Sequence, residues 1–333
     1  MPDEPRSERK SGARKIWLLS PVYLDSECYA LLHEQLNRVL DDSDRFADFE
    51  RRFVVLDDSA GGDLKTAELA SLPGVEVLTP PFNLGHQRGL VYTARLLAPE
   101  MADEDLVVTL DADGEDKPED VPRLLEALED PPVEVSKVVL ARRTSRRSAT
   151  FLFRALYPLF RLVFRAVTGV WVSTGNFAAF NGLTAKRLLL HPSFDTCYSS
   201  SLIAMDCPRT LIDCDRGDRY LGQSRMGYSK LSLHALRMLM PFTERIARRT
   251  LLLFLSILML AAVIAVVVLA VRLFTDSAIP GWATYTLLAL GIVILVSLGN
   301  LLILFTVFSH SRAISLSSLE SFGMQRSPEI DGG

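Results

Sequence analysis

Hydrophobic and polar residues divide the chain into two unlike parts. In the first part, short apolar runs alternate with segments whose apolar residues recur at helical spacing. Near the end, residues 250–274 and 282–308 form two apolar runs without the polar face that a helix in contact with water needs. Each run exceeds the roughly 20 apolar residues that cross about 30 Å of hydrocarbon as a helix. We therefore predict two transmembrane helices within residues 249–308, preceded by a juxtamembrane helix at 231–248.

The first part is predicted to be an α/β domain. Buried strands are expected where the apolar runs are short, at 16–19, 52–56, 75–78, 106–110 and 137–140. Helices are expected between strands, at 28–40, 86–97 and 118–128. This order predicts a mostly parallel sheet with flanking helices, whose ligands gather at the carboxyl ends of the strands.

Basic residues beside the two apolar runs predict the orientation of the chain. They precede the first run or follow the second, and are Arg237, Arg245, Arg248, Arg249 and Arg312. The side of the link between the runs carries only Arg272. Because positively charged flanks stay in the cytoplasm, we expect an integral membrane protein whose large N-terminal part is cytoplasmic. No C-x-x-C pair occurs among Cys28, Cys197, Cys207 and Cys214, which we expect to be reduced there.

Charge is distributed unevenly along the chain. The formal net charge of -4 argues against general nucleic-acid binding. Residues 135–194 contain no Asp or Glu, but they contain many Lys and Arg residues, with aromatic and aliphatic residues among the arginines. A helix of this composition at about 150–168 suits a membrane surface with anionic headgroups. A solvated basic face is the alternative, and both stay open at this point.

The acidic run after the strand predicted at 106–110 carries the most specific chemistry. Asp111, Asp113 and Glu115 alternate at the exit of that strand, and this alternation can present their carboxylates together. Carboxylate oxygens suit Mg²⁺ or Mn²⁺. A cation there would neutralise the charge that develops on a departing diphosphate. An acidic surface turn is the alternative.

A second acidic pair ends an earlier predicted strand. Asp57 and Asp58 close that strand and are followed by Ser59 and Gly61. Carboxylates at such a strand end accept hydrogen bonds from a nucleoside base or ribose in other nucleotide folds. A capped turn is the alternative.

Five short motifs follow one another along the chain. They are Ser20-Pro21-Val22-Tyr23, Val54-Val55-Leu56-Asp57-Asp58-Ser59, Asn83-Leu84-Gly85, Asp111-Ala112-Asp113 and Pro118-Glu119-Asp120-Val121-Pro122. This order resembles that of family 2 glycosyltransferases. With two C-terminal spans, the chain is similar to the polyprenyl-phosphate branch, which includes dolichol-phosphate mannose synthases and bacterial polyprenyl-phosphate glucosyltransferases. The resemblance covers most of residues 15–308 and implies a GT-A fold with its catalytic domain at 15–230.

The resemblance implies roles for particular residues. It places near the nucleoside Pro21, Tyr23, Asp57 and Asp58. It places at a Mg²⁺ or Mn²⁺ ion Asp111 and Asp113, and near the same ion Glu115, whose position is often Gln in the family. The arginines that hold the acceptor phosphate match Arg142, Arg143 and Arg154, which with Asp113 are the catalytic candidates.

A late basic segment resembles another motif of the family. Arg219-Tyr220-Leu221-Gly222-Gln223-Ser224-Arg225 is similar to the pattern R-x-x-G-x-S-K, with Arg225 in place of Lys. Lys230 follows shortly and offers a second basic group. The resemblance implies that this loop, with Arg219 and Ser224, lies beside the donor diphosphate, and Arg225 and Lys230 stay equal candidates for the main contact. A polar linker with incidental charge is the alternative.

Two segments depart from the family pattern. Where many relatives have an acidic residue before a G-x-F-R segment, this chain reads Ser173-Thr174-Gly175-Asn176-Phe177-Ala178-Ala179-Phe180. A carboxylate general base is therefore not expected at this site. A phosphate acceptor tolerates this loss because it is already anionic near neutral pH. The second departure is Leu24-Asp25 in place of the usual Asn-Glu after Tyr23.

The expected function is the transfer of a sugar from a nucleotide-diphosphate donor to a polyprenyl phosphate, inverting and metal-dependent. A processive polysaccharide synthase is one alternative, but such enzymes usually have more than two spans and a Q-x-x-R-W-type motif, which is not evident here. A catalytically silent membrane-anchored nucleotide-sugar-binding or scaffold protein is another, favoured by Ser173 and Leu24. A disordered tail at 1–14 and a flexible tail at 309–333 are expected. A homo-oligomer formed through the spans stays open.

Overall fold

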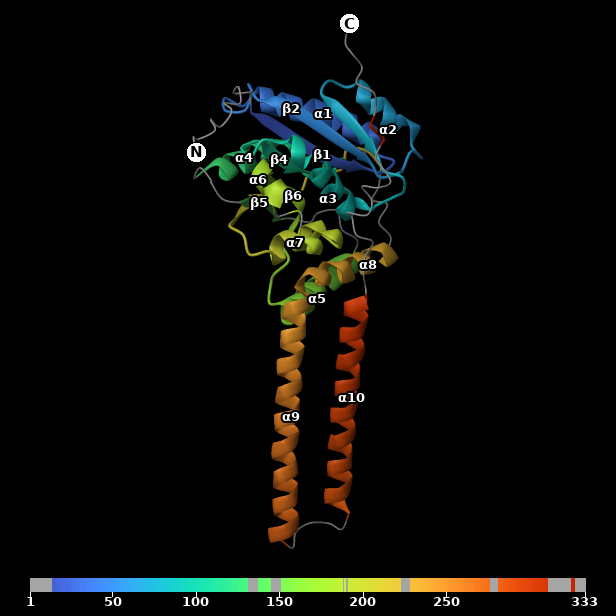
Figure 1. Cartoon of the computed structure of the whole chain (residues 1–333), viewed down its shortest axis with the longest axis vertical. Coiled ribbons are helices and arrows are strands. Elements are labelled where there is room, and N and C mark those ends of the chain that lie inside the picture. The colour runs from blue at the N-terminus through green and yellow to red at the C-terminus, as the bar shows by residue number, and fades with distance from the viewer. Residues whose placement is uncertain are drawn as a thin grey trace, which may run out of the picture. The chain divides into compact units, whose positions relative to one another are not determined.

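The computed structural model in Figure 1 describes residues 14–130, 137–144, 151–187, 189, 191–222, 228–275, 281–310 and 325–326. Contacts divide the chain into two compact units. The first contains the sheet with its helices, and the second consists of Leu156–Val172 and Phe242–Ala313. Most of the two predicted tails, at 1–14 and 309–333, lies outside the described residues.

The first unit is built on one mixed sheet. Its strands are β1 (Lys15–Val22), β2 (Glu50–Asp57), β3 (Val75–Thr79), β4 (Leu106–Thr109), β5 (Val138–Arg143), β6 (Thr174–Asn181), β7 (Arg209–Cys214) and β8 (Gln325–Arg326). They lie in the order β7-β5-β6-β4-β1-β2-β3-β8. The pairs β1–β2, β1–β4, β2–β3 and β5–β7 are parallel, whereas β6 is antiparallel to β4 and β5, and β8 to β3. The predicted mostly parallel sheet with flanking helices is confirmed.

The register of the three central strands aligns their carboxyl ends. Val22 of β1 is paired with Asp57 of β2, and Leu19 of β1 is paired with Thr109 of β4. Parallel strands that are neighbours end at the same edge of a sheet. The residues that follow them, among them Tyr23, Asp58 and Asp111, therefore leave the sheet along one edge.

Two strands in the second half of the sheet, β6 and β7, are absent from the sequence prediction. The sequence of β6 contains a glycine and two asparagines, and β-propensity scales rank both residue types low. Burial of its second half, including Phe177 and Phe180, against the strands on either side overrides that local preference. β7 has one buried residue and lies at an open edge, where a strand needs little hydrophobic content.

Helices cover both faces of the sheet. Those of the first unit are α1 (Ser26–Asp41), α2 (Leu64–Glu68), α3 (His86–Leu97), α4 (Val121–Glu129), α6 (Gly182–Arg187), α7 (Tyr198–Ala204) and α8 (Tyr228–Leu239). α1 and α4 contribute Leu32, Leu36, Leu124 and Leu128 to the main hydrophobic core. α3 lies on the other face, where it contacts β1, α6 and α7 (Figure 1). Both helical layers hold the strand ends, and the loops that follow them, in place.

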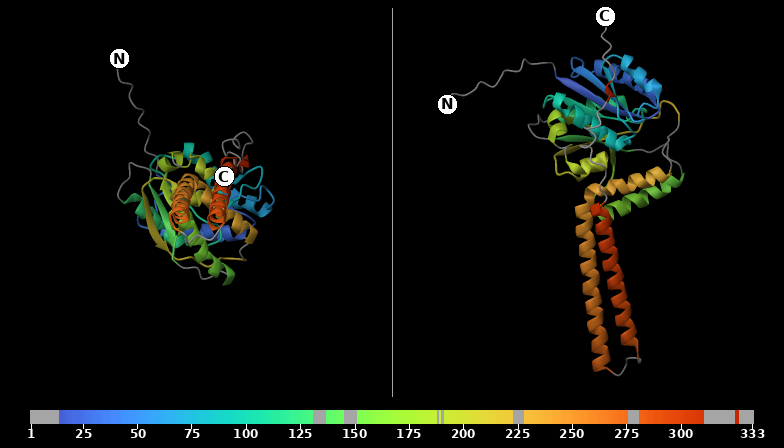
Figure 2. Two further views of the ribbon diagram at one scale, coloured as in Figure 1. Left: turned by 90° about the horizontal axis from the view of Figure 1, so that it is seen from below. Right: turned by 45° about the vertical axis from the view of Figure 1, so that its right-hand side comes forward.

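The second unit contains a hairpin of two long apolar helices. α9 (Thr243–Phe274) and α10 (Trp282–His310) lie side by side (Figure 2). Both are long and apolar enough to cross a membrane. Large side chains along them are exposed, such as Leu260 at 61% and Leu295 at 71%. Exposure of that extent is unfavourable in water and suits hydrocarbon.

A helix rich in arginine belongs mostly to the same unit as the hairpin. This helix, α5 (Phe151–Thr168), has the predicted position of about 150–168. Its Phe164 ring packs edge-to-face on Phe242 at 5.4 Å between centroids, and Arg249 of α9 donates to the carbonyl oxygen of Ala166 at 2.8 Å. Leu159 and Leu162 are exposed on α5 at 57% and 59%. The amphipathic helix is therefore attached to the base of the apolar hairpin, while its contact with a membrane surface stays a prediction.

Candidate active site

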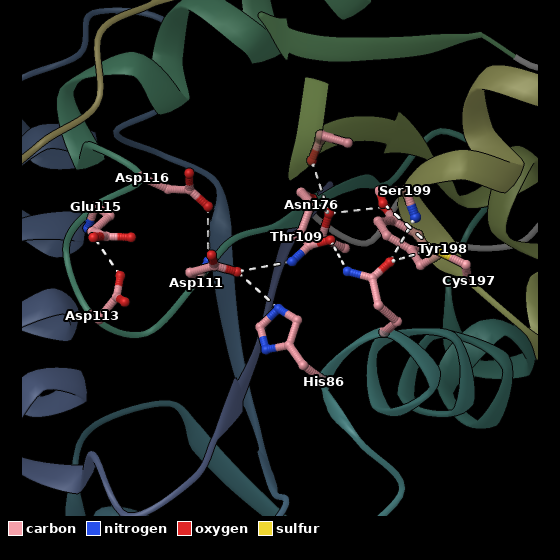
Figure 3. Close-up of polar contacts among 12 residues, drawn as sticks. His86, Thr109, Asp111, Asp113, Glu115, Asp116, Asn176, Cys197, Tyr198 and Ser199 are labelled. Carbon is pink, nitrogen blue, oxygen red and sulfur yellow. Dashed lines mark hydrogen bonds and ion pairs between the residues drawn. The ribbon is translucent and has the colours of Figure 1, made fainter. Parts of the chain in front are cut away.

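The acidic loop after β4 lies at the shared carboxyl edge of the parallel strands. Asp111 begins this loop. Its Oδ1 lies 2.8 Å from Nε2 of His86 and accepts a hydrogen bond from Nδ2 of Asn176 at 3.2 Å, as Figure 3 shows. Burial raises the pKa of Asp111, but the positive charges of His86 and Arg143 more than offset this, so its pKa is lowered. Asp111 is therefore a carboxylate held in one orientation from two sides.

Asp113 and Glu115 contact a different set of residues. Asp113 receives a hydrogen bond from Nη1 of Arg219 at 2.9 Å, and Glu115 forms an ion pair with Arg216. The backbone amide of Glu115 also donates to Oδ1 of Asp113 at 3.0 Å. Burial and then the negative charge of Asp111 raise the pKa of Asp113 to about 6. The carboxylates of this loop are therefore close enough to repel one another, and nearby basic groups offset this repulsion only in part.

Asp116 completes this loop, and no role was predicted for it from the sequence. Its Oδ2 accepts a hydrogen bond from the backbone amide of Asp111 at 3.0 Å, and its Oδ1 forms an ion pair with Arg143 at 2.9 Å. Burial and then Asp111 raise its pKa to about 6. Asp116 closes the loop on itself and fixes where Asp111 leaves the sheet. Its place beside Glu115 in the sequence was the available signal.

The carboxylates of this loop are of the type that binds a divalent cation, but their oxygens do not converge on one position. Among the residues that the structure describes, no three His, Cys, Asp or Glu side chains are grouped to hold a metal ion. Instead, Asp111, Asp113 and Glu115 each meet a separate basic residue. Carboxylate oxygens remain the ligands that Mg²⁺ and Mn²⁺ prefer, and a cation would neutralise the charge that raises the pKa of Asp113. Arg216 and Arg219 would have to leave their carboxylates before the three could share it.

The predicted acceptor arginines lie in different surroundings. Arg143 is partly buried and lies between Asp116, at 2.9 Å, and Asp111, at 3.6 Å. Arg142 pairs with the exposed Asp213 on the neighbouring strand β7, its Nη2 lying 2.7 Å from Oδ2 of that residue. Successive residues of a strand point to opposite faces, so the structure brings only Arg143 to the acidic loop. The side chain of Arg154 lies outside the described part of the chain.

The two carboxylates predicted to contact the nucleoside accept hydrogen bonds from backbone amides of nearby loops. Asp57 accepts hydrogen bonds from the backbone amides of Ser59 and Gly61 at 3.0 and 2.9 Å. Asp58 accepts from the backbone amides of Leu84 and Gly85 at 3.0 and 2.9 Å, and burial raises its pKa. These contacts join the loop after β2 to the loop before α3. Pro21 is buried at the end of β1, and Tyr23 is 42% exposed just beyond it.

A second loop packs directly on the acidic loop. The backbone amides of Gly217 and Tyr220 donate to the carbonyl oxygens of Glu115 and Asp113, both at 2.9 Å. The packing is close enough that a Cβ on Gly114 would lie 2.5 Å from the ring of Tyr220. The structure therefore brings Arg219 to the predicted metal ligands. Of the other residues predicted for this loop, Ser224 and Arg225 lie outside the described residues, as does the side chain of Lys230 in α8.

A partly buried polar network supports Asp111. Asn176 of β6 donates to Asp111 and accepts a hydrogen bond from Nε2 of Gln87 (Figure 3). Gln87 in turn accepts from the backbone amide of Ser199 at 2.9 Å. No role was predicted from the sequence for Asn176, Gln87 or His86. The available signals were that His86-Gln87 directly follows the motif Asn83-Leu84-Gly85 and that Asn176 lies in the segment that departs from the family pattern.

A cavity of about 720 Å³ lies beside this site. It is lined by Gly114, Tyr220 and several acidic side chains, including Glu119, Asp213 and Asp218. Neither Asp111 nor Asp113 lines it. None of the described residues predicted to bind the donor lines this cavity.

Comparison with known proteins agrees with the motif order. Residues 21–182 match the family described as glycosyl transferase family 2. A Bacillus subtilis (strain 168) protein named uncharacterized glycosyltransferase YkcC is 24% identical over 288 residues, which are 84% of this chain and 85% of that protein. Mannosyl-3-phosphoglycerate synthase from Rubrobacter xylanophilus aligns with a TM-score of 0.45 and 15% identity, over 71% of this chain and 74% of that one. A 4-diphosphocytidyl-2C-methyl-D-erythritol synthase aligns with a TM-score of 0.38 and 14% identity, over 68% and 98%.

Proposed function

We propose that this chain, a glycosyltransferase whose residues 21–182 form a glycosyl transferase family 2 domain, transfers a sugar from a nucleotide-diphosphate donor to a polyprenyl phosphate. The observation that carries the proposal is a combination. An acidic loop with Asp111 and Asp113 lies at the carboxyl edge of a parallel sheet, in a chain that continues into two helices apolar enough to span a membrane. The first feature suits a nucleotide sugar, and the second suits a substrate that lies in a bilayer.

The proposed reaction is a single displacement at the anomeric carbon of the donor sugar. An oxygen of the acceptor phosphate forms a bond to that carbon while the bond from the carbon to the donor diphosphate breaks. The nucleoside diphosphate leaves with the electron pair of the broken bond. Because the acceptor attacks from the face opposite the leaving group, the configuration is inverted. A Mg²⁺ or Mn²⁺ ion, when bound, would supply positive charge to the departing diphosphate.

Residues of the acidic loop have the first role in this proposal. Asp111, Asp113 and Glu115 would hold the cation once Arg216 and Arg219 release their carboxylates, and His86 and Asn176 keep Asp111 in place. Holding the groups in position before the donor binds avoids the cost of ordering them during the reaction.

The donor and the acceptor contact different residues. The nucleoside lies near Pro21, Tyr23, Asp57 and Asp58, and the diphosphate near Arg219, Ser224, Arg225 and Lys230. Arg143, with Arg154, steers the anionic acceptor toward the acidic loop. Arg142 faces Asp213, away from that loop, and takes no part. No carboxylate is needed where Asn176 stands, because a phosphate acceptor is already ionised near neutral pH.

The location of the reaction follows from the charges that flank α9. Arg245, Arg248 and Arg249 lie in its first two turns, and positive flanks favour the cytoplasmic side. The proposal therefore places the sheet and the acidic loop in the cytoplasm, where nucleotide sugars are made. The arginines and exposed leucines of α5 suit the anionic surface of the same leaflet.

Product analysis tests the proposal. The purified full chain is incubated in lipid nanodiscs with polyprenyl phosphate, Mn²⁺ and a panel of UDP- and GDP-sugars, and lipid extracts are analysed by mass spectrometry. We expect one hexose on the polyprenyl phosphate with one of these donors, and no such product when EDTA is added. A polymer, or no lipid-linked sugar with any donor, would overturn the proposal.

A further inference from the structure

Two arginines and a tryptophan gather at the end of α5. Cζ of Arg165 lies 4.6 Å from the centre of the Trp171 ring, and Cζ of Arg161 lies 5.0 Å from it. Gly169, whose φ is +84°, follows the helix as a left-handed residue and turns the chain back, so that Trp171 reaches both arginines. All of these residues belong to the second unit. We call Arg161, Arg165 and Trp171 the indole cluster.

The indole cluster holds two like charges together. Arg161 and Arg165 are four residues apart in α5 and therefore lie on the same face of the helix. Both guanidinium groups are attracted to the indole ring that they contact. Two like charges at this spacing repel each other. The contact with Trp171 thus keeps two positive charges side by side, and an anion bound between them would replace their repulsion with attraction.

The indole cluster has no acidic partner among the residues that the structure describes. No Asp or Glu of that part of the chain forms an ion pair with Arg161 or Arg165. Nε of Arg161 is buried and has no hydrogen-bond partner there. Arg143, in contrast, faces Asp116 at 2.9 Å. Residues 135–194 contain no Asp or Glu, so the neighbouring sequence does not supply one. The charge and the donors of the indole cluster therefore suit an anion from outside the chain.

The position of the indole cluster on the apolar hairpin suits a lipid headgroup. α5 lies across the base of the hairpin and not along it (Figure 2). Arg249 of α9 directly precedes the apolar run 250–274. Its Nη1 donates to the carbonyl oxygens of Arg165 at 3.3 Å and of Ala166 at 2.8 Å. The end of α5 is therefore held at the level where the apolar run begins. In a hairpin that spans a membrane, this is the level of the headgroups.

Exposed apolar side chains accompany the two arginines. Leu159, Leu162 and Val163 are exposed at 57%, 59% and 51%. Because the second and third follow the first by three and four residues, they share one face of α5. Trp171 is 44% exposed, and tryptophan is enriched at the interface between membrane and water. A phospholipid fits this combination, because its phosphate can meet the guanidinium groups while its acyl chains cover the apolar face.

We propose that Arg161, Arg165 and Trp171 bind the phosphate of an anionic phospholipid in the cytoplasmic leaflet. This inference rests on the membrane orientation in the proposed function, and it adds a lipid that is neither donor nor acceptor. Arginine binds phosphate through paired hydrogen bonds, and the indole ring holds both guanidinium groups in place for it. Phosphatidylglycerol is preferred over phosphatidylcholine, because two arginines repel the positive charge of choline. The bound lipid fixes the end of α5 to the membrane surface.

Lipid binding to the purified full chain tests this site. The chain is titrated in detergent with phosphatidylglycerol or phosphatidylcholine, and native mass spectrometry counts the bound lipids. We expect phosphatidylglycerol to bind about 10- to 30-fold more tightly. Arg161→Gln and Arg165→Gln should each weaken its binding about tenfold, as for the loss of a charged hydrogen bond. Trp171→Leu keeps both charges and removes only the ring beneath them, so it should weaken binding about two- to fivefold.

Arg272→Gln is the matched control. Arg272 is exposed in the last turn of α9, at the end opposite Arg249, so its loss removes one positive charge outside the indole cluster. Phosphatidylglycerol should bind this variant as it binds the unsubstituted chain. Thermal unfolding of every variant checks that the fold is retained.

Three results would overturn the inference: equal binding of the two phospholipids, unchanged phosphatidylglycerol binding in both arginine variants, and an equal loss in Arg272→Gln. Displacement of phosphatidylglycerol by an equal concentration of inorganic phosphate would show a site for free phosphate and contradict the lipid assignment. Tighter binding of polyprenyl phosphate than of phosphatidylglycerol would assign the site to the acceptor and would also overturn it. Because the titration contains no nucleotide sugar, its result does not depend on transfer, and the failure of the proposed function and the failure of this inference are separate results.

Discussion

Arg219 donates a hydrogen bond from Nη1 to Oδ2 of Asp113 at 2.9 Å, while its Nη2 lies 2.6 Å from Oδ2 of Asp25. Arg219 and Asp113 are each about 15% exposed. The guanidinium group of Arg219 therefore occupies the position next to Asp113 that a bound cation would need. Loop 215–222 and a metal ion compete for the same carboxylate.

This competition makes a prediction for metal binding without a donor. Arg219→Gln should tighten Mn²⁺ binding about tenfold, because removal of one member of this partly buried ion pair leaves the carboxylate of Asp113 uncompensated. Titration with Mn²⁺ followed by electron paramagnetic resonance measures the Kd. Arg142→Gln, which frees only the exposed Asp213, is the matched control and should bind Mn²⁺ as the unsubstituted chain does. Unchanged or weaker binding in Arg219→Gln would contradict the competition.

The contact between Arg219 and Asp25 gives a structural role to one residue of Leu24-Asp25, the segment that departs from the family pattern. Sequence comparison presents it only as the loss of a usual Asn-Glu pair. In the structure, Asp25 binds Nη2 of Arg219 while Asp113 binds Nη1 of the same guanidinium group. No pattern in the sequence links two residues 194 positions apart, because the contact depends on how the two loops fold together.

Asn176 is a positioning residue for Asp111. Asn176→Ala removes the hydrogen bond at 3.2 Å and the link to Gln87. We expect kcat to fall about 10- to 100-fold, as for other residues that orient a metal ligand, with little change in the KM for the donor. Gln87→Leu should lower kcat in the same direction but less, since it removes only the support of Asn176. Steady-state kinetics with both substrates would refute the role if Asn176→Ala kept its full kcat.

Gly114 is required by the packing of two loops. Gly114 has φ +85°, and a Cβ there would lie 2.5 Å from the ring of Tyr220, whose hydroxyl donates to Gln35 at 2.7 Å. Gly114→Ala should cost about 1–2 kcal/mol in backbone strain and a further 1–3 kcal/mol in overpacking. Gly222→Ala is the matched control, because Gly222 has φ +71° but no atom of the described residues within 4 Å of its Cβ position.

Thermal unfolding and transfer activity separate the two effects in the glycine variants. Gly222→Ala should show only the loss due to strain. Gly114→Ala should unfold at a lower temperature than Gly222→Ala and lose most of its kcat, since Tyr220 must move. Equal stability and activity in the two variants would show that Tyr220 does not pack on this loop as described.

His33 makes the stability of the first unit depend on pH. Burial lowers its pKa, and its Nε2 lies 3.0 Å from the carbonyl oxygen of Pro73. The unfolded chain therefore binds a proton at His33 at a higher pH than the folded chain. Stability from this residue is complete above the unfolded pKa of about 6.5 and is lost as the pH falls below it. The difference in melting temperature between pH 7.5 and pH 5.5 should shrink in His33→Gln, and an undiminished difference would rule out this contribution.

Much of the architecture follows from local patterns, and much of the site does not. The buried strands β1, β2 and β4 are short apolar runs that end at polar or turn residues, and the two apolar helices are long apolar runs, so the positions of these elements could be predicted. β6 could not, because its stability comes from its neighbours and not from its own residues. Asp111 and Asp113 could be proposed from their place after a buried strand.

The partners of those carboxylates required the tertiary structure. His86, Asn176 and Arg219 reach the acidic loop from a helix, an antiparallel strand and a late loop, which are far apart in the sequence. Arg142 and Arg143 show the reverse case. They are adjacent in the sequence and equal as candidates, but the alternation of β5 sends them to opposite faces.

The most direct test of the central claim is the transfer of labelled sugar to polyprenyl phosphate by Asp113→Asn. This substitution keeps the size of the side chain and its capacity to accept a hydrogen bond from Arg219, but it removes the negative charge that a cation needs. With the full chain in nanodiscs, and with folding checked by thermal unfolding, we predict that single-turnover transfer falls at least 1,000-fold, about 4 kcal/mol in activation free energy, while Arg142→Gln transfers normally. Transfer by Asp113→Asn at the rate of the unsubstituted chain would contradict the account.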